Sequence, residues 1–255
     1  PKRRTRATIA KEKGLEPLAT LIWNQELTIS PEEAAKAFLS EEKEVQSVED
    51  AIAGAKDILA EQISDEPNYR IYIRNLTAKQ ARITSTAKAP EEQSVYEMYY
   101  AYEEAVSKMA GHRVLALNRG EKEKILTVKG EGPEEKVFAY LEKQVIKQQN
   151  EYTTQILKDV IQDSYRRLVA PAIEREIRNE LTERAEDGAM EVFGKNLEQL
   201  LMQPPIVGQT VLGWDPAFRT GCKLAVVDPT GKVLDTTVIY PTAPTTPQKI
   251  AAAKE

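Results

Sequence analysis

A single carboxylate stands at the end of an expected strand, in the segment Gly213-Trp214-Asp215-Pro216. A strand end fixes a carboxylate and leaves room for Mg²⁺ beside the sheet, as metal-dependent phosphoryl chemistry requires. Such chemistry needs several converging carboxylates, and this stretch adds only Asp228 and Asp235. We therefore favour an Asx-type turn ahead of Pro216 over a metal ligand at Asp215.

Basic residues are concentrated at the N-terminus. Residues 1–13 hold six cations and one acid, whereas residues 31–66 hold eleven acids and three lysines. Clustered Lys and Arg release counterions when they neutralise phosphates, so this arm is a candidate nucleic-acid contact. On charge pattern alone we favour a solvated helix end that docks on the acidic segment. The candidate phosphate contacts of the arm are Lys2, Arg3, Arg4 and Arg6.

Residues 4–19 also have the sequence pattern of a helix-turn-helix unit, with Gly14 between two short helical runs. In such units the second helix enters the major groove of DNA. Glu16, near the start of the second run, would repel phosphates, so we favour a packed helical hairpin.

Arg119 is a further candidate phosphate contact. Glu121 and Glu123 lie beside it in the sequence and lower the local positive potential, which favours a turn held by an ion pair.

Tyrosines 96, 99, 100 and 102 have both a binding and a packing interpretation. Aromatic side chains stack on bases in single-strand binders. The spacing favours packing on a helix instead, with Tyr99 and Tyr102 pointing inward.

The composition excludes several classes of protein. Forty acids against 35 Lys and Arg give a net charge of −5, which argues against a histone-like protein. The lone Cys222 cannot form an intramolecular disulfide, and the lone His112 excludes a His-rich metal site. We expect no metal, no cofactor and no membrane association, because no apolar run is long enough to span a bilayer. We expect a cytoplasmic protein and, since the sequence starts without Met, a piece of a longer one.

A helical period dominates the first 200 residues. Ser30 before Pro31 predicts a helix start, and a stripe from Val45 to Ile63 predicts a long helix that Pro67 ends. A second stripe, from Val95 to Met109, predicts another helix.

A third stripe runs from Leu157 to Leu168, and Pro171 is expected to interrupt it before a further helix continues to Leu201. The segment from His112 to Lys129 is either a helix followed by a strand near 124–129 or a hairpin; we favour the helix and single strand.

After residue 205 the period changes to two. Strands are expected over residues 210–215, 224–228 and 233–240, as an antiparallel three-stranded meander, with a helix starting at 248. The expected fold is mainly α: an elongated multi-helix region over 1–205, with a short β element, followed by an incomplete α/β domain over 206–255.

Four stretches carry a family resemblance. The segment from Trp214 to Asp228 resembles the opening of the RuvC/YqgF-type, RNase H-like domain of the bacterial Tex family of transcription accessory proteins. The segments Pro1 to Ala19, Ser94 to Tyr102 and His112 to Glu123 resemble the helical N-terminal region of that family, in the same order.

The resemblance implies a nucleic-acid-associated scaffold related to eukaryotic elongation factors, with helix-hairpin-helix repeats and an OB-fold RNA-binding domain further downstream. Asp215 matches the first carboxylate of active resolvases, but Ala217 stands where resolvases usually have a glycine. We therefore expect no enzymatic activity. The expected partners are RNA or DNA, mostly through domains outside this sequence, and RNA polymerase. The alternatives are a metal-dependent, structure-selective nuclease that uses Asp215 and a pure protein-interaction module.

Overall fold

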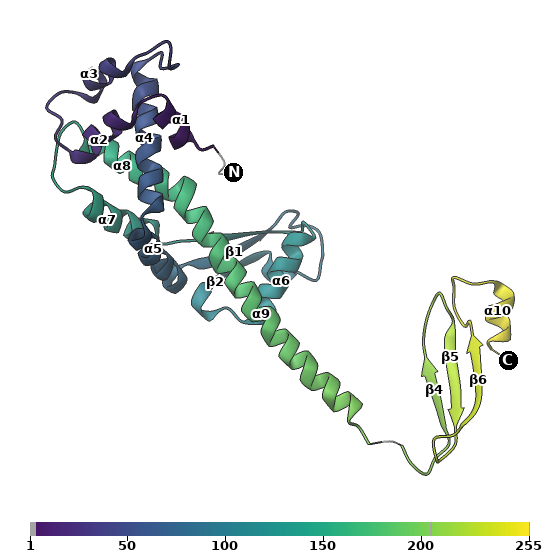
Figure 1. Cartoon of the computed structure of the whole chain (residues 1–255). Coiled ribbons are helices and arrows are strands. Elements are labelled where there is room, and N and C mark those ends of the chain that lie inside the picture. The colour runs from purple at the N-terminus through teal and green to yellow at the C-terminus, as the bar shows by residue number, and fades with distance from the viewer. Residues whose placement is uncertain (1–3, 205, 255) are drawn as a thin grey trace. The chain divides into compact units, whose positions relative to one another are not determined.

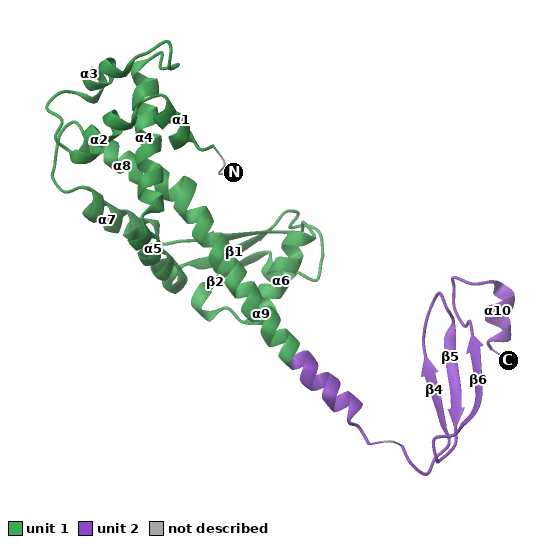
Figure 2. Ribbon diagram, viewed as in Figure 1, with its two compact units in different colours: residues 1–191 green, residues 192–255 purple. Residues whose placement is uncertain are grey.

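The computed structural model describes residues 4–204 and 206–254, which form two compact units, 1–191 and 192–255 (Figures 1 and 2). Each unit is described by itself. The helices and 3₁₀ turns of the first unit, up to residue 145, are α1 (Arg6–Glu12), α2 (Glu16–Asn24), α3 (Pro31–Ala35), η1 (Lys36–Phe38), α4 (Val48–Asp65), α5 (Pro67–Gln80), η2 (Glu97–Tyr99), η3 (Val106–Lys108), α6 (Gly111–Lys122) and α7 (Glu134–Val145).

Helix α4 is the element on which α1, α2 and α3 pack (Figure 1). Ser47 caps α4, since its Oγ accepts a hydrogen bond from the backbone N–H of Asp50 at 3.1 Å. The buried row on this helix includes Ala55, Leu59 and Ile63, as its spacing predicts. Val45 is buried too, but it precedes the cap and pairs with Ser40 in an isolated β-bridge, so its assignment to the helix is wrong.

Pro67 ends α4 and begins α5. The first position of a helix needs no N–H donor, so a proline fits there, and the side chain of Glu66 accepts the N–H of Asn68 at 3.3 Å. The sequence interpretation took Pro67 only as a stop and missed this helix.

A three-stranded antiparallel sheet follows, in the order β2-β1-β3. Its strands are β1 (Arg82–Ala87), β2 (Ala101–Ala105) and β3 (Leu126–Glu131). The predicted helix from Val95 to Met109 is therefore wrong: this segment contains η2, β2 and η3. Tyr99 and Val106 are buried because a 3₁₀ turn and a strand end direct them inward, whereas Val95 is 87% exposed.

The favoured interpretation of the segment from His112 to Lys129 is confirmed, because α6 is followed by β3. Lys124 turns the chain between them with a φ of 64°. Gly120 lies buried inside α6, where an added Cβ would approach Leu126 Cδ1 to 2.6 Å. The absence of a side chain lets the helix pack closely on β3.

One long helical run covers the sheet. It comprises α8 (Thr154–Asp163), a π-helical segment η4 (Ser164–Val169) and α9 (Ala170–Leu201). Ile83, Gly130 and Ile173 line one small internal cavity, which places α9 against β1 and β3. The Oε1 atom of Glu174 accepts the N–H of Gly130 at 2.8 Å.

Pro171 does not interrupt this run, contrary to expectation. It lies in the first turn of α9, directly after η4. A π turn widens the backbone hydrogen-bond spacing, so the missing N–H of a proline is accommodated there without a break.

Gln25 joins α2 to the loop between α7 and α8. It is 3% exposed and has a φ of 61°. Its Nε2 donates to the carbonyl of Val145 at 2.9 Å, and its Oε1 accepts the N–H groups of Lys147 and Gln148 at 2.9 and 3.2 Å. One side chain thus satisfies three backbone groups more than 100 residues away in the sequence.

The second unit contains the expected meander. Strands β4 (Val211–Asp215), β5 (Cys222–Val227) and β6 (Val233–Ile239) pair antiparallel in chain order, and α10 (Pro247–Ala252) follows. Gly213 is opposite Ala225, and Asp215 is opposite Lys223.

Candidate nucleic-acid contacts

The N-terminal arm is only partly described, because Lys2 and Arg3 lie outside the described residues. Arg4 forms an ion pair with Glu12 of α1, the one acid of residues 1–13. Arg6 is exposed in the first turn of the same helix. Thr5 caps α1 and donates its hydroxyl to Glu61 of α4 at 2.8 Å. This helix end therefore packs on the acidic helix α4.

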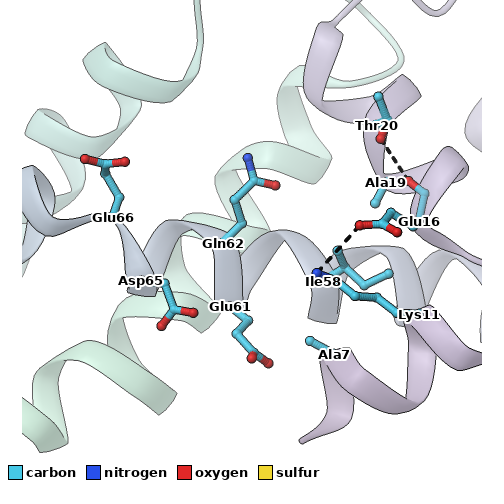
Figure 3. Close-up of a pocket in the computed structure, with 10 residues that line it drawn as sticks. All are labelled: Ala7, Lys11, Glu16, Ala19, Thr20, Ile58, Glu61, Gln62, Asp65 and Glu66. Carbon is cyan, nitrogen blue, oxygen red and sulfur yellow. Dashed lines mark hydrogen bonds and ion pairs between the residues drawn. The ribbon is translucent and has the colours of Figure 1, made fainter.

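Gly14, whose φ is 80°, turns the chain between α1 and α2, and both helices pack on α4. A cavity of about 440 Å³ is lined by residues of these three helices (Figure 3). Lys11 pairs with Glu16 across it at 3.6 Å, and the other charged residues of its lining are the acids Glu61, Asp65 and Glu66. This excess of carboxylates repels phosphates, which argues against a DNA-reading α2.

Arg119 lies exposed in the last turn of α6, and the nearer of the two acids beside it in the sequence is engaged elsewhere. Glu121 pairs with Arg178 of α9 at 2.5 Å. Glu123 lies beside Tyr96, and burial followed by the Glu123 carboxylate raises the pKa of this tyrosine. The expected ion pair between Arg119 and its neighbours does not form within the described residues.

Three lysines lie near Arg119. Lys122 and Lys124 belong to the same turn, and the backbone N–H of Lys88 donates to the carbonyl of Ile125 at 2.9 Å, which brings the end of β1 to this turn. All are exposed and form no ion pair with a described residue. We call the set of Lys88, Arg119, Lys122 and Lys124 the basic turn.

Sequence reasoning missed Lys88 and its context. Residues 67–90 contain five cations and no acid, a signal that charge counting in a sliding window would have found. Acids of other elements neutralise part of this excess: Arg70 and Arg74 bind Glu176 and Glu180 of α9 at 3.1 and 2.7 Å, and Arg82 binds Glu103 of β2. Lys79 and Lys88 remain without an acidic partner among the described residues.

The tyrosines of residues 96–102 pack, although not on a helix. Tyr96 and Tyr99 are buried, and Tyr100 donates to the carbonyl of Glu92 at 2.6 Å. Tyr102 donates to Glu104, which also accepts from Arg113 at 2.5 Å. Burial and the bond to Glu104 raise the pKa of Tyr102 to about 12. The hydrogen bond from Tyr102 and the guanidinium of Arg113 lower the pKa of Glu104.

Asp215 is the exposed last residue of β4, and Lys223 is its cross-strand partner. On β6, Asp235 is opposite Val226 of β5. Val226 is three residues from Lys223, the cross-strand partner of Asp215, and successive side chains of a strand point to alternate faces. Asp235 therefore lies on the opposite face of the sheet from Asp215. The carboxylate of Asp228 closes its own turn, accepting the N–H groups of Thr230 and Lys232 at 2.8 and 3.0 Å. These three carboxylates do not converge.

No three His, Cys, Asp or Glu side chains of residues 4–204 and 206–254 are grouped as a metal site requires. Across the same residues, no helix combines the length and apolar character needed to cross a bilayer. Cys222 is buried at the start of β5.

Comparison with known proteins assigns both units. The "Tex central region-like" family model matches residues 26–193, and the "Tex protein YqgF-like domain" model matches residues 209–255. The chain is 55% identical over 260 residues to "Uncharacterized protein YdcI" of Bacillus subtilis, covering 99% of the chain and 36% of that protein.

More distant relatives agree. "Transcriptional accessory protein Tex" of Neisseria gonorrhoeae is 34% identical over 255 residues, covering 94% of the chain and 32% of the relative. Human "S1 RNA-binding domain-containing protein 1" is 29% identical over 250 residues, covering 92% of the chain and 25% of the relative. The chain thus spans about a third or less of these relatives. With matching models for its central region and for the start of its second unit, the chain belongs to the Tex family.

Proposed function

We propose that this chain is a non-catalytic, nucleic-acid-associated part of a transcription accessory protein, and that the basic turn is its phosphate contact. The observation that carries the proposal is the ion pair of Glu121 with Arg178, which leaves Arg119 and the neighbouring lysines exposed without an ion pair to a described acid, while Glu123 adds one carboxylate nearby. The names of two relatives, one a transcriptional accessory protein and one an S1 RNA-binding domain-containing protein, support the same role.

Acidic residues lie near the basic turn, and they limit the expected affinity for nucleic acid. The loop between β1 and η2 carries Glu91 and Glu92, and η2 begins at Glu97. These acids reduce the long-range attraction, so we expect a local contact of modest affinity that other domains of the whole protein reinforce.

The non-catalytic part of the proposal rests on Lys223. Opposite residues in an antiparallel pair project from the same face, with Cβ atoms about 5 Å apart. An ammonium group at that position repels a divalent cation held by Asp215. The other carboxylates of this sheet lie on the opposite face or in a closed turn, so they supply no compensating ligands.

A protein-interaction role is the second candidate, and α9 favours it. Residues 186–203 are all exposed, and Met190, Phe193 and Leu197 follow one another at three- and four-residue steps with exposures of 63, 68 and 41%. An apolar row of this kind suits a partner helix or groove.

The test is the salt dependence of nucleic-acid binding. Replacing Arg119, Lys122 and Lys124 together by Gln removes three positive charges. We expect the slope of log affinity against log salt for single strands to fall by roughly 2, at about 0.7 per phosphate contact. The matched control replaces Lys108, Lys147 and Arg184, which are exposed and also lack ion pairs with described residues, so the net charge changes equally.

Two results would contradict the proposal. Equal slopes for the test and control variants would mean that only net charge matters and that the basic turn is no contact. Mn²⁺- or Mg²⁺-dependent cleavage of branched or single-stranded substrates by the full-length protein, lost in Asp215→Asn, would refute the non-catalytic assignment.

A further inference from the structure

Three tyrosines of α5 and α7 cluster on the first unit, and two of their rings stack. Tyr72 of α5 lies face to face with Tyr140 of α7, with ring centroids 3.6 Å apart and an interplanar angle of 13°. Tyr69 meets Tyr140 edge-on, at 6.1 Å and 87°. Tyr69 and Tyr140 pack against the hydrophobic core, so Tyr72 is the outermost ring.

Tyr72 remains open to solvent. Its side chain is 42% exposed although Tyr140 covers one face of the ring, and the neighbouring Ile71 is 60% exposed. Helices α5 and α7 lie next to each other (Figure 1), and a second tie joins them, since Lys136 Nζ donates to Gln80 Oε1 at 2.7 Å. Two contacts on different turns fix the ring pair in place, so the surface is organised before any ligand arrives.

The charge around this stack is positive. Lys136 and Lys143 lie four residues before and three residues after Tyr140, on the same face of α7, and Lys79 lies two turns after Tyr72 on α5. All three are exposed and form no ion pair within the described part of the chain. Each of these ammonium groups is therefore available to a phosphate.

The acids nearby reduce this excess only in part. On α7, Glu134 pairs with Arg166 at 3.0 Å and Glu142 with Lys158 at 3.9 Å, whereas Glu135, next to Lys136, pairs with no described cation. Helix α5 contains no acid, and its Arg70 and Arg74 are bound by α9. Glu66 precedes α5 and, after burial, contributes to the raised pKa of Tyr69 and Tyr140, so it lies near that end of the stack. Lys79 and Lys136 lie at the opposite end of α5, which gives the surface a positive side away from Glu66.

We infer that the outer face of Tyr72, backed by Tyr140 and flanked by Lys79, Lys136 and Lys143, binds single-stranded nucleic acid by stacking one base and holding the adjoining phosphates. An aromatic ring accepts any base because every base has a π face, and lysines follow the backbone without reading sequence. The site rests on the proposed nucleic-acid role and adds a second contact to it. Duplex is a poor ligand, because its bases are already stacked on one another.

The experiment uses the 255-residue chain and a short single strand that contains 2-aminopurine. Stacking on Tyr72 is expected to quench 2-aminopurine fluorescence. Tyr72→Ala should abolish the quenching and weaken binding roughly tenfold, whereas Tyr72→Phe keeps the ring and should keep both. Lys79→Gln with Lys143→Gln, which leaves the Lys136 tie intact, should lower the salt slope by about 1.4 and leave the quenching at saturation unchanged. Far-UV circular dichroism and the melting temperature of each variant check that the fold is intact.

The outcomes separate this site from the proposed function. If the chain binds and the basic-turn variant weakens binding, but Tyr72→Ala changes neither quenching nor affinity, the stacking site is refuted and the proposed function stands. If the chain binds no single strand at low salt, both are refuted. If polyglutamate displaces the strand as effectively as unlabelled oligonucleotide, and no quenching occurs, the surface recognises an acidic polypeptide and the inference is overturned.

Discussion

Removal of the Gln25 side chain tests the view that one residue ties α2 to the loop after α7. Gln25→Ala deletes four side-chain hydrogen bonds: three to backbone groups of Val145, Lys147 and Gln148, and a local one to the carbonyl of Trp23 at 3.2 Å. At about 1 kcal/mol net for each of the three long-range bonds, the free energy of unfolding of the first unit should fall by at least about 3 kcal/mol. For a unit of this size the melting temperature should fall by roughly 6–12 °C.

Gln25→Gly separates the backbone contribution from that of the side chain. It loses the same side-chain hydrogen bonds but relieves the left-handed conformation at φ 61°, which costs a non-glycine residue about 1 kcal/mol. We therefore expect the glycine variant to be about 1 kcal/mol more stable than the alanine variant.

The assay is urea unfolding followed by Trp23 fluorescence, in a Trp214→Phe background that leaves Trp23 as the reporter of the first unit. A loss below about 0.5 kcal/mol in Gln25→Ala would refute the reasoning, because that is the range of an ordinary surface substitution. Water would then satisfy the loop as well as Gln25 does.

Two further predictions concern packing and pH. Gly120→Ala places a Cβ 2.6 Å from Leu126 Cδ1 and 3.2 Å from Tyr96 Cδ1, so despite a helix-propensity gain near 1 kcal/mol, overpacking should destabilise the first unit by about 1 kcal/mol or more in urea unfolding. The control Gly188→Ala, which meets nothing within 4 Å on α9, should be neutral or stabilising; a similar loss in both would contradict the packing argument. Because the pKa of Tyr102 in the folded protein is raised to about 12 from its usual value of 10.0, its stabilisation is complete below pH 10 and should be lost as the pH rises through 12. Tyr102→Phe should flatten this alkaline loss of unfolding free energy, and an unchanged pH profile would show that Tyr102 is not its source.

The fold could be predicted from the sequence where periodicity was uninterrupted. The row from Ala55 to Ile63 and the period-two strands after residue 205 have one dominant pattern each, and both were confirmed. Tyr99 and Tyr102 were misassigned because three-residue spacing also arises when a 3₁₀ turn runs directly into a strand. Pro67 and Pro171 both occur at helix starts, where proline is tolerated, and a stop and a start look alike without the structure.

The candidate site was harder to predict because charge in a sequence does not show which partners it has. Arg119 has acids on its C-terminal side, yet Arg178 from a distant element pairs with one of them, Glu121. Tyr72 and Tyr140 are 68 residues apart, and no local pattern indicates that their rings stack. Asp215 was correctly placed at a strand end, whereas its pairing with Lys223 depends on the strand register.

The π-helical segment η4 sets the rotational phase of the rest of its helical run. A π turn holds an extra residue, so side chains after Val169 are set back by about 100° relative to an uninterrupted α-helix of the same length. That phase directs Ile173, Ile177 and Leu181 into the core. Deletion of one residue within 164–169 would restore regular α-helical bonding and keep this row facing the core, whereas the same deletion in the regular helix just before Ile173 would turn the row toward water. The π-helical segment is therefore the place where this helical run tolerates a change of length.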